Sequence, residues 1–101
     1  MAQPDLQEVH RAKVNLETSR IAWKELQRFF ASGVAIFVNA ELDLVDVGYQ
    51  FSQDNKQQVE RWLLAGKIGK VSDEQAAAWL EADMEVWAVV VSPWVLMQQA
   101  D

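Results

Sequence analysis

The side chains that could do chemistry are few and scattered along the chain. There is one histidine, His10, and no cysteine. A nucleophile–histidine–acid triad or a multi-histidine metal site would depend on His10 alone, and disulfides and thiolate chemistry are excluded. Glycine-rich nucleotide-binding motifs and nucleophile elbows do not occur in the sequence. The sequence therefore predicts that the protein is not an enzyme, with no catalytic residue and no cofactor-binding residue.

Carboxylates are the remaining candidates for a metal site. Asp43 and Asp46 are three residues apart, so in a helix both could reach one hard cation. The alternative is that Asp43 caps the helix and Asp46 lies in its first turn, where a negative charge is favourable. The capping interpretation explains both residues without a metal and is preferred. The predicted cofactor and metal content is therefore none.

Composition favours a single domain over residues 1–101, with a peripheral N-terminal helix in residues 1–18 and a core in residues 19–98. The apolar run in residues 86–97 is about half as long as a membrane span and contains a proline. The N-terminus has no apolar signal-peptide region, and the lack of cysteine agrees with a reducing compartment. We expect a cytoplasmic protein that does not bind membranes.

The hydrophobic pattern predicts the elements that must position any site. Helices are expected over residues 5–17, 20–32, 42–52, 55–65 and 73–82, and strands over 34–38, 67–71 and 86–91, with residues 94–97 extended. The stretch at 85–98 is apolar on both faces, as in a strand in the middle of a sheet. Gly48 costs its helix about 1 kcal/mol relative to alanine and indicates the close approach of another element. Capping boxes are predicted at Asp54 with Gln57, and at Ser72 with Gln75.

From residue 23 onward, this order resembles a winged helix-turn-helix. The resemblance implies an α+β, winged-helix-like fold of about five helices with a small, mostly antiparallel three-stranded sheet. Residues 67–71 and 86–91 would form the wing hairpin, with the helix at 73–82 at its tip.

The same resemblance implies a possible nucleic-acid surface in residues 54–71. Its contact residues would lie on the recognition helix and at the base of the wing, namely Lys56, Gln57, Arg61, Lys67 and Lys70. Against this function, the net charge of the chain is −6, and phosphate contacts require clustered basic residues. Leu64 also shares the outward face with Arg61, which suits a protein partner better than DNA.

Apolar residues outside the predicted core indicate a protein interface. The helix at 42–52 has a second apolar face, and Trp94 follows Pro93 at a break in the sheet, whereas Trp62, Trp79 and Trp87 are predicted to be core. The candidate interface residues are Leu42, Val45, Tyr49, Leu64 and Trp94. We therefore predict a non-enzymatic protein-interaction or regulatory module that self-associates, with the nucleic-acid-binding regulator as the alternative.

Four stretches of sequence resemble a family of small bacterial proteins known only as a domain of unknown function. They are WKEL at 23–26, LDLVDV at 42–47, VERW with GKIGKV in 59–71, and WAVVVSPWVLMQ at 87–98. The resemblance covers nearly all of the chain beyond residue 18. It implies a bacterial cytosolic protein and transfers no catalytic residues.

Overall fold

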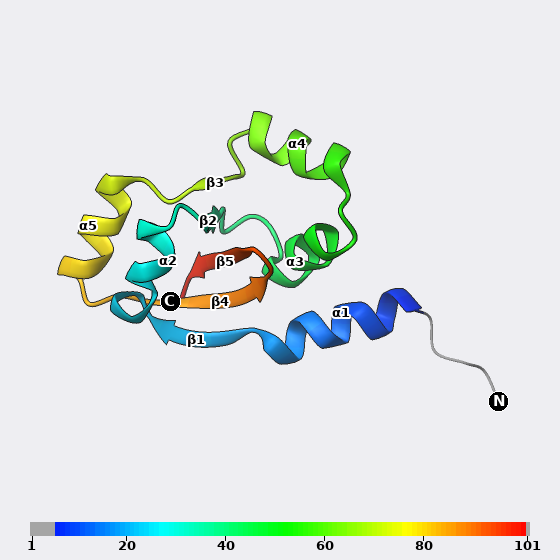
Figure 1. The fold of residues 1–101 in the computed structure, drawn as a ribbon, viewed down its shortest axis with the longest axis horizontal. Helices are drawn as coiled ribbons and strands as arrows, with labels where there is room; N and C mark the ends of the chain where they lie inside the picture. Colours follow the sequence, from blue (N-terminus) through cyan, green and yellow to red (C-terminus); the bar gives the residue numbers. More distant parts are fainter. Residues whose placement is uncertain (1–5, 101) are drawn as a thin grey trace.

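The computed structural model describes residues 6–100, which contain five α-helices, one 3-10 helix and five strands (Figure 1). The molecule measures 52 × 27 × 24 Å, with the N-terminal helix at one end of the long axis. In chain order the elements are α1 Leu6–Glu17, β1 Ser19–Ala22, η1 Trp23–Leu26, α2 Gln27–Ala31, β2 Ala35–Val38, α3 Leu44–Ser52, α4 Lys56–Leu64, β3 Ile68–Lys70, α5 Asp73–Glu81, β4 Glu85–Val91 and β5 Trp94–Gln99.

The five strands form one mixed sheet in the order β1-β4-β5-β2-β3. β5 runs parallel to β2, and every other neighbouring pair is antiparallel. The apolar stretch at 85–98 supplies β5, which is the middle strand of the sheet, and its neighbour β4, and the two are joined by a turn at Ser92 and Pro93. Its predicted central position is confirmed.

The α+β class is confirmed, but the three-stranded sheet and the wing hairpin were wrong. β3 pairs with β2, through Phe37 opposite Gly69, and β4 pairs with β5 and β1. A strand that is apolar on both faces must have both faces covered, as in the middle of a sheet between two layers of helices, whereas a wing hairpin leaves one face in water. The predicted helix at 20–32 was also partly wrong, because it is divided into β1, η1 and α2.

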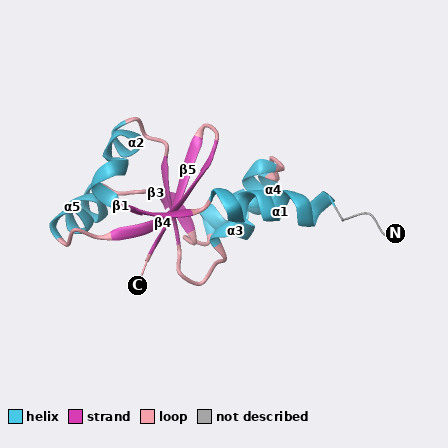
Figure 2. Cartoon of the chain, turned by 90° about the horizontal axis from the view of Figure 1, so that it is seen from below, coloured by secondary structure: helices cyan, strands magenta, loops and turns pink. Residues whose placement is uncertain are grey.

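Helices cover both faces of the sheet, with α2 and α5 on one side and α1, α3 and α4 on the other (Figure 2). η1 belongs to the first side, because its Trp23 and Leu26 are buried in the same core as Trp79 of α5. Successive strand residues point to opposite faces. Val95 therefore belongs to the core beneath η1, α2 and α5, whereas Leu96 belongs to the core beneath α1, α3 and α4. This division explains why both faces of β4 and β5 are apolar.

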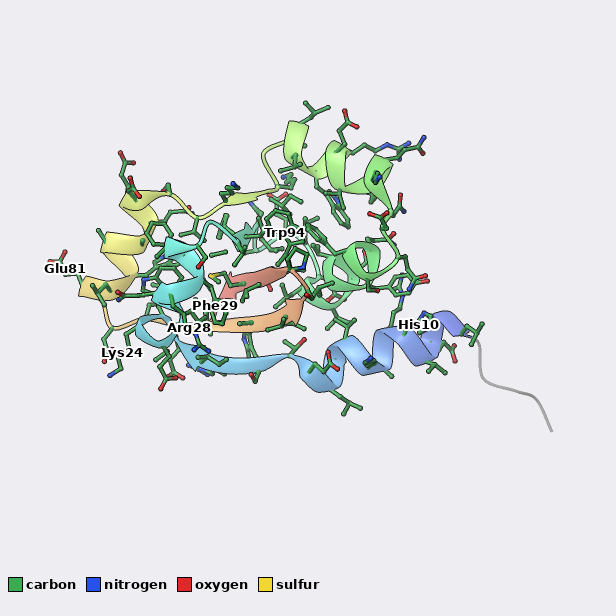
Figure 3. The ribbon with its side chains drawn as sticks, in the orientation of Figure 1. His10, Lys24, Arg28, Phe29, Glu81 and Trp94 are labelled. Atoms are coloured by element: carbon green, nitrogen blue, oxygen red, sulfur yellow. The ribbon has the colours of Figure 1, made fainter. Side chains whose placement is uncertain are left out.

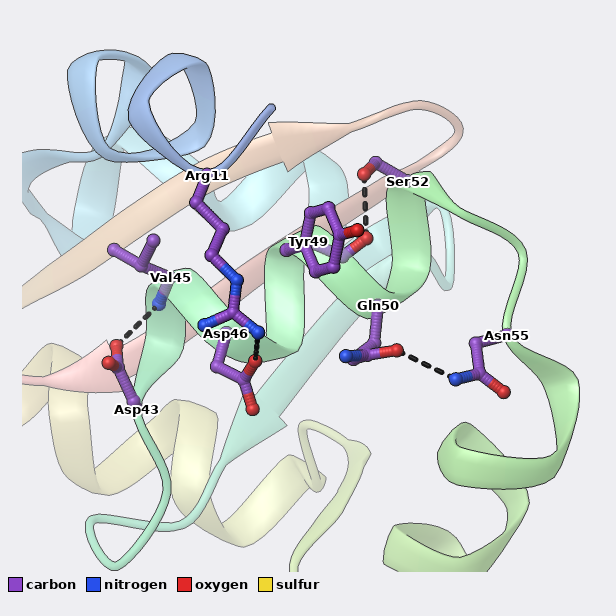
Figure 4. A network of polar contacts seen from close by, with 8 residues as sticks. All are labelled: Arg11, Asp43, Val45, Asp46, Tyr49, Gln50, Ser52 and Asn55. Carbon is purple, nitrogen blue, oxygen red and sulfur yellow. Dashed lines mark hydrogen bonds and ion pairs between the residues drawn. The ribbon is translucent and has the colours of Figure 1, made fainter. Parts of the chain in front are cut away.

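The predicted close approach at Gly48 is confirmed, and the approaching element is α1. A Cβ atom at Gly48 would lie 2.8 Å from Cγ1 of Val14, which is buried in α1. Polar contacts complete the interface, since Nε2 of Gln53, the residue that follows α3, lies 3.1 Å from Nδ1 of His10, and Figure 3 shows His10 on α1. Arg11 forms an ion pair of 2.9 Å with Asp46 and stacks 4.8 Å from the ring centre of Tyr49 (Figure 4).

Two of the three predicted helix caps are correct. The Asp43 carboxylate accepts from the Val45 N–H (Figure 4), and Ser72 forms the capping box with Gln75. The predicted cap at Asp54 was wrong, because Asn55 accepts from the Gln58 N–H instead. Asp54 has a φ of 54°, in the left-handed region, and it turns the chain between α3 and α4.

Two tryptophans differ from their predicted environments. Trp87 was predicted to be core but is 41% exposed, and its register neighbours, Arg20 and Gln98, are polar. Trp62 is half-buried rather than buried. Trp79 is buried as predicted, and it packs edge-on against Trp23 with ring centres 5.1 Å apart.

Candidate protein-binding surface

α4 lies at the margin of the sheet next to β3 and carries exposed apolar side chains. None of its residues is buried, and only Gln58, Val59 and Trp62 are half-buried. Leu63 is 51% exposed and Leu64 is 82% exposed. Adjacent helix residues point about 100° apart, so both leucines cannot face the sheet. α4 therefore offers a solvent-exposed apolar edge.

A groove lies between α4, the end of α3 and the β4–β5 turn. Its inner lobe, about 210 Å³, is almost entirely apolar, with Lys70 as its one charged lining residue among Ile36, Phe51, Val59, Leu63, Ile68 and Trp94. Its outer lobe, about 460 Å³, shares Phe51, Val59, Leu63 and Trp94 with the inner one and adds charged residues of both signs, Asp54, Lys56 and Glu60. Figure 3 shows Trp94 at the sheet, between α3 and α4.

Charge changes sign along the chain at β3. Residues 54–71 carry a net charge of +2, from Lys56, Arg61, Lys67 and Lys70 against Asp54 and Glu60. Residues 72–101 carry six acidic side chains and no basic one. Since α4 leads into β3 and α5 follows it, a basic and an acidic element flank the same strand (Figure 1).

β3 lies at the edge of the sheet and pairs with β2 alone. The Asn39 N–H donates to the Lys67 carbonyl at 2.8 Å, and the Val71 N–H donates to the Ala35 carbonyl at 3.1 Å. In an antiparallel ladder, alternate residues direct their backbone groups to the same neighbour. Gly69 therefore faces β2, while the N–H and C=O groups of Ile68 and Lys70 point away from the sheet.

The predicted interface residues are divided between two places. Leu42 and Val45 are half-buried and pack on the core beneath α3. Tyr49 is 6% exposed, with the Arg11 side chain of α1 over its ring. The second apolar face of α3 is thus covered by the chain's own N-terminal helix. Leu64 and Trp94 lie instead at the α4 side, on its exposed edge and in the groove.

The candidate nucleic-acid residues are spread over α4 and β3. Lys56, Gln57 and Arg61 are exposed on α4, and Lys70 is exposed on β3. Lys67 forms an ion pair with Glu41. No hairpin joins these residues into a wing, because β3 and β4 are not neighbours in the sheet.

Sequence reasoning missed Leu63 and Leu80, which were assigned to buried helix stripes but are about half-exposed. Both lie next to the last residue of a nine-residue helix at the margin of the sheet. A pattern of helical spacing does not show where a helix passes the end of the surface that it covers. The pair of adjacent leucines in α4 was the available signal.

Asp43 and Asp46 do not form a shared site, since Asp43 is an N-cap and Asp46 is paired with Arg11. Across residues 6–100, no group of three or more histidine, cysteine or acidic side chains is arranged to hold a metal ion. In the same part of the chain, no helix has the length and apolar character needed to cross a membrane.

Comparison with known proteins gave one family and one solved structure. No curated protein sequence matches the chain. The solution NMR structure of PA1075 from Pseudomonas aeruginosa is similar, with 40% sequence identity over 100% of this chain and 94% of that chain and a TM-score of 0.81. The family model described as "Protein of unknown function (DUF2288)" matches residues 9–99. The chain therefore belongs to the DUF2288 family of proteins of unknown function, in agreement with the resemblance seen in its sequence.

Proposed function

We propose that the chain is a cytoplasmic, non-enzymatic protein-interaction module whose partner is a second copy of itself. The observation that carries the proposal is the apolar edge of α4, where Leu63 and Leu64 are exposed side by side next to the groove. Single exposed apolar residues are ordinary, whereas contiguous apolar surface marks interaction sites. Covering this edge removes apolar surface from water, which favours association by about 25 cal/mol for each Å² that is covered.

The charge pattern favours a second copy as the partner. With a net charge of −6, two copies repel one another unless parts of opposite sign meet. The basic segment at 54–71 and the acidic α5 flank one margin of the sheet. A two-fold axis through that margin brings the end of the basic segment of each copy next to the start of the acidic segment of the other. Complementary charges of this kind select the partner and its orientation.

A second apolar surface competes with this one. α1 exposes Leu6, Val9 and Leu16 at helical spacing. Lys13 and Glu17 are four residues apart in that helix, so charges of both signs share one side of it and none is separated to orient a second copy. We therefore place self-association at α4 and use α1 as the matched control.

Leu64→Glu is expected to weaken self-association by about thirtyfold or more, because burying a carboxylate where a leucine packed costs at least about 2 kcal/mol. The matched control is Leu16→Glu, since Leu16 is 84% exposed and receives the same substitution on α1. Light-scattering mass and sedimentation equilibrium over a concentration series measure the association. A wild-type protein that stays monomeric, or an association lost in Leu16→Glu and kept in Leu64→Glu, contradicts the proposal.

Nucleic-acid binding is the second candidate, favoured by the exposure of Lys56 and Arg61 on α4. We expect no retardation of mixed duplex fragments at low salt, because Glu60 lies in the same helix and the rest of the chain is strongly acidic. Gel-shift titration of the wild type and Arg61→Glu measures this. Retardation that falls steeply with salt and weakens in Arg61→Glu would support nucleic-acid binding instead.

A further inference from the structure

We infer that two copies of the chain join through the free edges of their β3 strands, which pair antiparallel so that one sheet continues into the other. The inference rests on the proposed self-association and assigns its geometry. β3 is the strand that lies between the basic α4 and the acidic α5.

The first argument is the unpaired backbone of β3. Ile68 and Lys70 each direct one N–H and one C=O group away from β2. In the described part of the chain, no other strand lies beyond β3 to receive these groups. Four backbone groups at strand spacing are complementary to another extended strand, and a row of this kind is the usual template for pairing between chains.

The second argument is that the edge can pair with itself. With a two-fold axis at Gly69, Ile68 of one copy lies opposite Lys70 of the second copy, and the same pair occurs again on the other side of the axis. The outward groups then form four hydrogen bonds between the two strands. The two Gly69 residues lie opposite one another at the axis and form a non-hydrogen-bonded pair, the kind of pair in which the two strands approach most closely. A Cβ at Gly69 would have no atom within 4 Å, so the space around it is open.

The third argument is that this register places no like charges directly opposite one another. Lys70 lies opposite an isoleucine rather than another lysine, and Lys67 is already paired with Glu41. Antiparallel pairing brings the chain that enters β3 close to the start of α5 in the second copy. Like charges directly opposite would destabilise the pair, whereas opposite charges support it.

The other edge strand, β1, does not meet these conditions. The Trp23 N–H donates to the Met84 carbonyl of the neighbouring chain segment. Since alternate residues of β1 bond to β4, the backbone groups of Arg20 and Ala22 point outward. Arg20 is paired with Glu85 at 3.3 Å. β1 lies at the opposite edge of the sheet from β3, so pairing of two β1 strands would leave the exposed leucines of α4 uncovered.

Gly69→Cys tests the register directly, because the chain has no cysteine of its own and the new thiol is unique. Non-hydrogen-bonded residues across an antiparallel pair have Cα atoms about 4.5 Å apart, at the short end of the range that a disulfide spans. Under mild oxidation with glutathione disulfide, we expect most of the variant to become a covalent dimer on a non-reducing gel. The matched control is Ile21→Cys, at the midpoint of the β1 edge, which is expected to remain without an intermolecular disulfide.

Lys70→Pro is the second variant, since it removes an outward N–H group and no hydrogen bond to β2. It is expected to weaken self-association by about tenfold or more, because an interface hydrogen bond is lost and its carbonyl partner is left unpaired. Lys70→Thr keeps the N–H group and is the matched control. Circular dichroism melts of all four variants identify any that fail to fold.

Three outcomes overturn the inference. They are a folded Gly69→Cys variant that does not cross-link while the wild type is dimeric, equal cross-linking of the Gly69→Cys and Ile21→Cys variants, and a Lys70→Pro variant that associates as Lys70→Thr does. Each of them leaves self-association itself standing. A monomeric wild type overturns both the self-association and the β3 pairing.

Discussion

Replacing Trp23 with alanine is expected to lower the free energy of unfolding by about 3–5 kcal/mol. Trp23 is 1% exposed and lies in the core beneath η1, α2 and α5. Its ring packs edge-on against Trp79 at 5.1 Å and Phe30 at 5.9 Å between ring centres. Its indole N–H donates to the Ala76 carbonyl at 3.0 Å. One side chain therefore ties η1 to α5, through two residues that are 53 positions apart in the chain.

Two matched variants separate the contributions of Trp23. Trp23→Phe keeps an aromatic ring but loses the hydrogen bond from the indole N–H to the Ala76 carbonyl, at a cost of about 0.5–1.5 kcal/mol. Trp87→Ala removes the same side chain from a half-exposed site on β4 and is expected to cost less than Trp23→Ala. Urea unfolding followed by circular dichroism measures all three. Equal losses for Trp23→Ala and Trp87→Ala would contradict the assignment of Trp23 to the core.

Gly48→Leu is expected to displace α1 and lower the free energy of unfolding by about 2 kcal/mol. A Cβ at Gly48 already lies 2.8 Å from Val14 and 3.6 Å from Val89, so a leucine side chain has no room. Overpacking of this kind costs about 1–3 kcal/mol, or more, and the better helix propensity of leucine returns about 0.8 kcal/mol. Because α1 also covers Tyr49, its displacement exposes the second apolar face of α3.

Hydrogen exchange and a double-mutant cycle identify the cause of that loss. In Gly48→Leu, amide exchange is expected to accelerate in α1 and to remain slow in β4 and β5. Gly48→Ala should show a smaller destabilisation, and Val14→Ala in the same chain should relieve part of it, with a coupling of at least about 0.5 kcal/mol. Strict additivity of Gly48→Ala and Val14→Ala would show that the two residues do not contact one another.

Local patterns of sequence determined much of this structure. The Ser72 and Gln75 capping box, the Asp43 N-cap and the left-handed Gly33 at the end of α2 depend on hydrogen bonds and backbone angles within a few residues. The apolar stretch at 85–98 indicated burial on both faces, because no one-sided sheet could accommodate it. Gly48 indicated a close neighbour, because glycine destabilises a helix relative to alanine and is expected there when a packed element leaves no room for a Cβ atom.

Tertiary structure decided which partner each element received. Strand pairing depends on contacts between distant residues, so nothing local distinguished a wing hairpin of 67–71 and 86–91 from the observed β2–β3 and β4–β5 pairs. The same limit applies to the candidate site. Tyr49 had the pattern of an exposed face, and only the position of α1 covered it, whereas Leu63 had the pattern of a buried one, and only the position of α4 at the sheet margin exposed it. Periodicity reports that a helix has an apolar face, but the arrangement of the other elements determines whether the chain itself covers that face.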